Sequence, residues 1–86
     1  MKDTTAKQRI NKAVREACKG QSEAIINYFK ELIFRDYQSF KYSDYTEESD
    51  TNNLNFAIEI HLQEDFKESL AELIEEEKQG KKIKLL

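Results

Sequence analysis

LNFAIEIHLQ, residues Leu54–Gln63, is the stretch from which the fold is predicted. Large apolar side chains alternate in it with polar or small ones along its whole length. Because successive side chains of a β-strand point to opposite faces, this period of two predicts a strand with one buried and one polar face. The other segments are expected to cover the apolar face, which consists of Leu54, Phe56, Ile58, Ile60 and Leu62.

A first helix is predicted near the N-terminus. Thr4 and Thr5 are suitable N-caps, and Gly20 is a suitable C-terminal stop. Small and apolar residues recur between these ends at helical spacing, which predicts a shallow buried face. The opposite face is cationic and carries Arg9, Lys12, Arg15 and Lys19.

A second helix is predicted to begin near Gln21 or Ser22, and Ser22 is the better N-cap. Its apolar arc is broad. Continuing the helix would put Asp36 inside this arc and Phe34 on the polar side. We therefore expect the second helix to end near Phe34 or Arg35.

The rest of the chain is expected to complete a small antiparallel sheet. Residues 37–42, YQSFKY, predict a short irregular strand, and residues 43–53, SDYTEESDTNN, a polar loop. The tail KKIKLL, residues 81–86, is expected to be an edge strand or a frayed end, and residues 1–4 are also expected to fray. The predicted class is α+β: three helices on two or three strands, in the order α-α-(β)-β-α-(β), within one domain of residues 1–86.

Composition indicates a small folded cytoplasmic protein. Charged residues make up 36% of the 86 residues, but nine aromatic residues and the strong periodicities favour folding over disorder. The single cysteine, Cys18, excludes an internal disulfide and fits a reducing compartment. No run of about 18 apolar residues and no signal-peptide pattern is present. We therefore expect a cytoplasmic location without membrane contact.

No catalytic or metal-binding pattern is recognisable. His61 and Cys18 are the only residues of their types, and neither has a recognisable partner for nucleophilic catalysis. Glu59 and His61 share one face of the predicted strand, but a metal site needs three or four ligands. Two glycines, Gly20 and Gly80, are too few for a glycine-rich phosphate loop. We expect no enzymatic activity, no cofactor and no metal.

A third helix is predicted over residues 64–79, with Gly80 expected to end it and an apolar stripe of Phe66, Leu70, Leu73 and Ile74. The side opposite this stripe is strongly acidic. Carboxylates four residues apart on a helix repel each other by about 0.2–0.5 kcal/mol per pair. Such a row is either a solvated face or a surface presented to a basic partner, in the manner of nucleic-acid phosphates. The predicted partner-binding acids are Glu64, Asp65, Glu68, Glu72, Glu75 and Glu76.

Aromatic residues provide a second candidate contact surface. Seven of the nine lie between Tyr28 and Tyr45, which is a large number for a small core. Exposed aromatic side chains are enriched at protein interfaces because they give large contact area at low entropic cost. The residues hardest to bury, and therefore the expected anchors, are Phe34, Tyr37 and Tyr45.

Charge is distributed unevenly along the chain. Residues 1–20 hold six basic and two acidic residues, a net charge of +4, and residues 21–79 hold five basic and fifteen acidic residues, a net charge of −10. Three lysines in residues 80–86 bring the total to −3. Basic ends therefore flank an acidic middle.

Two functions fit this sequence. The favoured one is a non-enzymatic regulatory or inhibitor protein that binds a protein partner through the acidic helix and aromatic anchors. The sequence does not identify this partner; a basic protein that handles nucleic acid is one example. Small acidic inhibitors of phages and mobile elements share this size and composition. The alternative is a nucleic-acid-associated regulator that binds phosphates through Arg9, Lys12, Arg15 and Lys19. The negative net charge favours the first function.

A homodimer is also predicted. A sheet of so few strands leaves an unpaired edge, which is a template for a second chain. The shallow apolar face of the first helix is the other expected route.

Overall fold

The structure is a computed structural model that describes residues 2–43 and 47–83, without the side chains of residues 41–43, 47–49 and 64. Within these described residues, every regular element is a helix. The elements are α1 (Asp3–Ala17), α2 (Glu23–Ser43), α3 (Glu47–Glu59), the π-helical turn η1 (Ile60–Glu64) and α4 (Phe66–Lys78). The predicted α+β class is wrong, because residues 2–43 and 47–83 contain no strand and no sheet.

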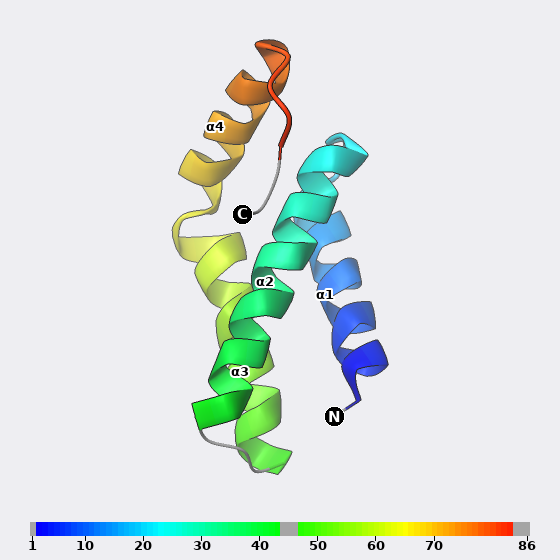
Figure 1. The fold of residues 1–86 in the computed structure, drawn as a ribbon, viewed down its shortest axis with the longest axis vertical. Helices are drawn as coiled ribbons and strands as arrows, with labels where there is room; N and C mark the ends of the chain where they lie inside the picture. Colours follow the sequence, from blue (N-terminus) through cyan, green and yellow to red (C-terminus); the bar gives the residue numbers. More distant parts are fainter. Residues whose placement is uncertain (1, 44–46, 84–86) are drawn as a thin grey trace.

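The longest helix, α2, is the centre of the arrangement (Figure 1). α1 runs antiparallel to α2 along one side. α3 returns beside the C-terminal half of α2, and α4 continues along its N-terminal half, on the side opposite α1. The 21 residues of α2 span about 31 Å. That length accounts for most of the longest dimension of the molecule, 43 Å.

The core lies where α1 meets α2. Three positions of α1 and its C-cap residue, each four residues apart, are buried, and they face the broad apolar arc of α2. Because this face of α1 is covered within the molecule, it is not free to form the predicted homodimer. The sheet-edge route to a homodimer is removed together with the sheet. The α1 residues are Ala6, Ile10 and Val14, followed by the C-cap Cys18, and the most deeply buried α2 residues are Ile25, Phe29, Ile33 and Tyr37.

The start of α2 confirms the sequence prediction, and the start of α1 does not. Ser22 caps α2, because its Oγ accepts a hydrogen bond from the backbone N–H of Ile25 at 3.3 Å. α1 begins at Asp3, before both predicted caps, Thr4 and Thr5. An acidic residue in the first turn is favourable because the helix N-terminus carries partial positive charge.

The end of α2 differs from the prediction, since the helix continues past Phe34 and Arg35 to Ser43 and includes the predicted strand 37–42. Neighbouring elements cover α2 on two sides. Phe34 is buried on the side of α1, where Lys7 lies over its ring. Asp36 faces η1 on the other side. Buried positions therefore occur on more than one face of α2. A prediction that assumes a single apolar face places the end of this helix too early.

The predicted strand 54–63 is the end of α3 followed by η1. Leu54 and Ala57 are buried, whereas Phe56, expected beside Leu54, is 54% exposed. Burial at 54 and 57, with Ile58 partly buried, has helical spacing rather than a period of two. The strand prediction for residues 54–63 is wrong because it places Ala57 on the polar face, whereas the methyl group of Ala57 is buried in the core.

The π turn keeps the inward side chains of the C-terminal half in register. Successive members of this row are four residues apart, and in an α-helix each such step overshoots a full turn by about 40°. A π-helical turn contains more residues than an α-helical turn, so four residues in it rotate the chain by less. The π turn η1 and the break at Asp65 therefore offset the rotation that the row accumulates in the α-helices. The row comprises the partly buried residues Ile58, Leu62, Phe66, Leu70 and Ile74.

Most of the predicted loop 43–53 is also helical. Ser43 ends α2, and residues 47–53 belong to α3, while residues 44–46 lie outside the described residues. Asp50 is only 1% exposed and accepts a hydrogen bond from the hydroxyl of Tyr37 at 2.5 Å. Residues 47–53 are therefore helical despite their polar, acidic composition, and this helix contacts α2 through a buried hydrogen bond.

The C-terminal end of α4 confirms the stop at Gly80. This glycine has a φ of +76°, and its N–H donates to the carbonyl of Glu77 at 3.1 Å while the N–H of Lys81 donates to Glu76 at 3.0 Å. This pair of hydrogen bonds is a Schellman motif. Residues 81–83 contain no strand, which removes the edge-strand alternative for this part of the tail, and residues 84–86 lie outside the described residues.

Candidate binding surfaces

The acidic row predicted on the third helix lies on the exposed side of α4. None of its described carboxylates forms an ion pair with another described residue. Glu75 accepts a hydrogen bond from Gln79 at 3.3 Å, one turn further along. Glu64 belongs to η1, and its side chain is not described. The exposed members, hereafter the acidic face, are Asp65, Glu68, Glu72, Glu75 and Glu76.

Packing on the opposite side fixes the direction in which the acidic face points. Leu73 is buried against the core, and the ring of Phe66 lies 5.4 Å from that of Phe29 in α2. The hydroxyl of Ser22 donates to the carboxylate of Glu77 at 2.6 Å, which joins the end of α4 to the start of α2. α4 is thus anchored along its length, and the acidic face is directed away from the bundle.

The predicted cationic face of α1 is divided by the fold. Arg15 is engaged within the molecule: its guanidinium lies 3.0 Å from Glu23 and donates to Asn11 at 2.9 Å. The hydrogen bond from Arg15 holds the pKa of Glu23 below its usual range and raises the pKa of Arg15. The other three cations are exposed and form no ion pair within the described residues. They are Arg9, Lys12 and Lys19.

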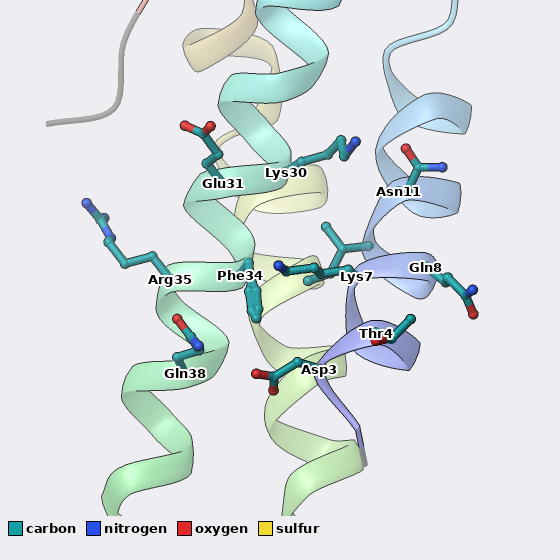
Figure 2. Close-up of a pocket in the computed structure, with 11 residues that line it drawn as sticks. Asp3, Thr4, Lys7, Gln8, Asn11, Lys30, Glu31, Phe34, Arg35 and Gln38 are labelled. Atoms are coloured by element: carbon teal, nitrogen blue, oxygen red, sulfur yellow. The ribbon is translucent and has the colours of Figure 1, made fainter.

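A groove of about 770 Å³ lies between α1 and α2, and no sequence motif pointed to it (Figure 2). The ammonium group of Lys7 lies 4.9 Å from the ring centroid of Phe34. Lys30 extends from α2 toward Asn11 on the facing wall, whereas Arg35 is directed outward. Neither groove lysine forms an ion pair with a described residue. Each wall therefore carries both signs of charge, because Asp3 of α1 and Glu31 of α2 line the same groove as the two lysines.

Two of the three predicted aromatic anchors are covered by the fold. Tyr37 is fully buried and Phe34 is 9% exposed, so neither can act as an exposed contact. Tyr45 lies outside the described residues. Phe56, which was assigned to the buried face of a strand, is instead the large exposed hydrophobic side chain of the described region, and its ring lies 5.6 Å from that of Phe40.

The chemically reactive residues do not converge on a site. His61 pairs with Asp36 across the α2–η1 contact, rather than with Glu59. Burial raises the pKa of the Cys18 thiol, which keeps it protonated and poorly nucleophilic. No group of three or more histidine, cysteine or acidic side chains in the described part of the chain is arranged to hold a metal ion. Binding surfaces are therefore the features from which function can be inferred.

No protein-family model, curated protein or solved structure matches this chain. Among the described residues, every helix is too short or too polar to cross a membrane. The function is accordingly inferred from surface geometry and charge.

Proposed function

We propose that this chain is a non-enzymatic regulatory or inhibitor protein of the cytoplasm that binds a basic surface of a protein partner through the acidic face of α4. One observation carries the proposal: Asp65, Glu68, Glu72, Glu75 and Glu76 are all exposed, and no ion pair within the described residues compensates them. Asp65 and Glu68 lie at the N-terminus of α4, where negative charge favours the helix. Repulsion among Glu72, Glu75 and Glu76 opposes helix formation, so folding gives no reason for the acids beyond the first turn.

The geometry of the acidic face suits a partner with clustered arginine or lysine side chains. Glu68, Glu72 and Glu76 recur every four residues, which spaces them about 6 Å apart along the helix axis. Carboxylates at this spacing can each accept two hydrogen bonds from an arginine. Basic patches of this kind occur on proteins that handle nucleic acid. Since Phe34 and Tyr37 are buried, the proposal depends on charge rather than on aromatic anchors.

Affinity capture with a charge-reversed variant tests the proposal. The immobilised protein and its Glu68→Lys/Glu72→Lys/Glu76→Lys variant are exposed to the same lysate at low salt, and the retained proteins are compared. We expect a basic protein that the wild type retains and the variant loses. Binding should also weaken as salt is raised, because mobile ions screen exposed charges.

A matched control separates the acidic face from net charge. Glu16→Lys/Glu31→Lys/Glu59→Lys changes net charge by the same amount at exposed positions on α1, α2 and α3. Circular dichroism verifies that each variant is folded. Retention of the same proteins by the wild type and the α4 variant contradicts the proposal, as does equal loss in the control.

A second candidate function is phosphate binding through α1, which the exposure of Arg9, Lys12 and Lys19 favours. Gel-shift titration with a duplex DNA and a single-stranded RNA, at several salt concentrations, measures it. A shift that weakens steeply with salt and disappears in Arg9→Ala/Lys12→Ala would support this function. Absence of any shift at low salt excludes it.

A further inference from the structure

The junction between α3 and α4 contains one residue more than a continuous α-helix needs to keep its apolar side chains on one face. Each residue of an α-helix advances the side-chain direction by about 100°. In a continuous helix, Phe66 would lie about 80° and Leu73 about 60° around the axis from Ile58. Leu70 and Ile74 would lie further around, at about 120° and about 160°. Removal of one residue would bring all four within about 60° of Ile58, and the π turn η1 provides this correction without a deletion.

The sequence itself permits the continuous helix. No glycine or proline lies between residues 47 and 79, and these are the two residue types that most strongly oppose a helix interior. Asp65, the residue at the break, has a φ of −105° and a ψ of 7°, so a change at this residue alone reaches the α-helical values of about −63° and about −42°. Its side chain forms no capping hydrogen bond with the described residues of α4. The break is therefore maintained by tertiary contacts rather than by a local cap.

The tertiary contacts that hold α4 are limited. The ring of Phe66 contacts that of Phe29, Leu73 is the buried residue among those described in α4, and the hydroxyl of Ser22 donates to Glu77. By comparison, α1 buries three residues to 1% exposure or less. Elements that bury little apolar surface open locally at a lower free energy than the whole fold. α4 is therefore the helix best placed to leave the bundle.

We propose that the α3–α4 junction is a two-state switch. In the closed state, which is the one described above, η1 is π-helical and the apolar stripe of α4 packs against α2. In the open state the junction is α-helical, α3 and α4 form one helix, and the stripe is rotated by about 100° out of its contact with α2. His61 precedes the rotation and keeps its contact with Asp36, so the pivot lies in residues 62–65. Helical hydrogen bonds gained across Asp65 offset part of the burial that is lost.

Opening uncovers the apolar stripe of α4 beside the acidic face. An amphipathic helix of this kind binds with its apolar side in the groove of a partner. The switch therefore sets whether a partner meets the acidic face alone or the whole amphipathic helix. This consequence rests on the proposed function, whereas the switch itself is measured on the isolated protein.

Thiol labelling measures the opening. Leu73→Cys places a thiol in the stripe, and the fully buried Cys18 of the same chain reports opening of the rest of the core. Each labelling rate is divided by the rate of the same thiol in urea-unfolded protein, and peptide mass spectrometry resolves the two positions. We expect the thiol at position 73 to react at least about tenfold faster than Cys18. Equal normalised rates would show that α4 leaves α2 only when the whole protein unfolds, which overturns the proposal.

Deletion of Gln63, which is exposed in η1, removes the extra residue and should hold α4 closed as a regular continuation of α3. In the Leu73→Cys chain this deletion should slow labelling at position 73 by at least about tenfold without making Cys18 more reactive. Deletion of Asn55, exposed within α3, is the matched control, because it turns Leu54 about 100° away from the core and should make Cys18 more reactive. A Gln63 deletion that does not fold, or that leaves the rate at position 73 unchanged, overturns the proposal.

Hydrogen exchange distinguishes rotation of an intact helix from unravelling of α4. The amides of residues 72–77 keep their helical hydrogen bonds in the open state, so they should be protected at least about tenfold more than the thiol at position 73. Equal protection of these amides and of the thiol would show that α4 unravels, which contradicts the switch. Failure of the switch leaves capture of a basic protein by the acidic face unaffected, and failure of that capture leaves the labelling ratios unchanged.

Discussion

Nε2 of His61 lies 2.5 Å from Oδ2 of Asp36, which joins the π turn η1 to the middle of α2. Both side chains are largely buried, with 18% and 27% of their surfaces exposed. Asp36 lies on the inward side of α2, and His61 of η1 is its partner there. It also connects α2 to the turn from which α4 departs.

Removal of either member of this pair should destabilise the fold. His61→Ala and Asp36→Ala are each expected to lower the free energy of unfolding by about 1–3 kcal/mol, because the remaining polar group loses its hydrogen bond. Urea denaturation followed by circular dichroism measures the change. The double variant should lose less than the sum of the two, and additive losses would show that the residues do not interact. Gln63→Ala, exposed in the same turn, is the control.

The buried hydrogen bond between Tyr37 and Asp50 makes a second prediction. Tyr37→Phe preserves the ring but removes the donor, so the free energy of unfolding should fall by about 1–3 kcal/mol. Tyr28→Phe removes a hydroxyl from a partly buried ring on the same helix and serves as the control. Equal stability of the two variants in urea would contradict a stabilising role for the contact.

Helical and strand conformations of residues 54–59 predict different mutational effects. In the helix Leu54 is buried, so Leu54→Ala should lower the free energy of unfolding by about 2–5 kcal/mol. Phe56 is half exposed and contacts Phe40, so Phe56→Ser should cost less than about 1.5 kcal/mol. A strand would bury both side chains equally. Thermal or urea unfolding of the two variants distinguishes these cases.

Reversal of one acid in the middle of the acidic face should stabilise the protein. Glu72→Lys replaces repulsion with attraction toward Glu68 and Glu76, each four residues away, and should raise the free energy of unfolding by about 0.5–1 kcal/mol at low salt. Glu72→Gln, which removes only the repulsion, should have a smaller effect. Decreased stability of Glu72→Lys would mean that the acidic row contributes to folding after all.

The ion pair between Arg15 and Glu23 predicts a measurable titration. The pKa of Glu23 is lowered by the hydrogen bond from Arg15, so the folded state holds this proton less tightly than the unfolded state does. Stabilisation by this group is therefore present above the ordinary carboxyl pKa and is lost as pH falls through the lowered value. Arg15→Gln should move the Glu23 midpoint upward in an NMR titration. Lys12→Gln, which removes a charge from the same helix, should move it much less.

Local signals in the sequence were sufficient for several elements. Ser22 and Gly80 mark helix ends through hydrogen bonds made within a few residues, and both predictions are confirmed. The apolar stripe of α4 is also confirmed, with Leu73 buried and Phe66, Leu70 and Ile74 packed against the core. The two helix ends depend on nearby residues alone, and the stripe follows the regular spacing of one helix, so the sequence specifies these features directly.

The tertiary structure decided the rest, because burial there depends on partners that are distant in sequence. Leu54–Gln63 fits both a strand and a helix in its own periodicity, and contact with α2 selects the helix. Asp36 ends a helix only if it lacks a partner, and His61, 25 residues later, supplies one. Charge depends on tertiary packing in the same way. The acidic row and the cations are visible in the sequence, but the packing of α1 and α4 on opposite sides of α2 determines which of the described ones are exposed and form no ion pair with another described residue.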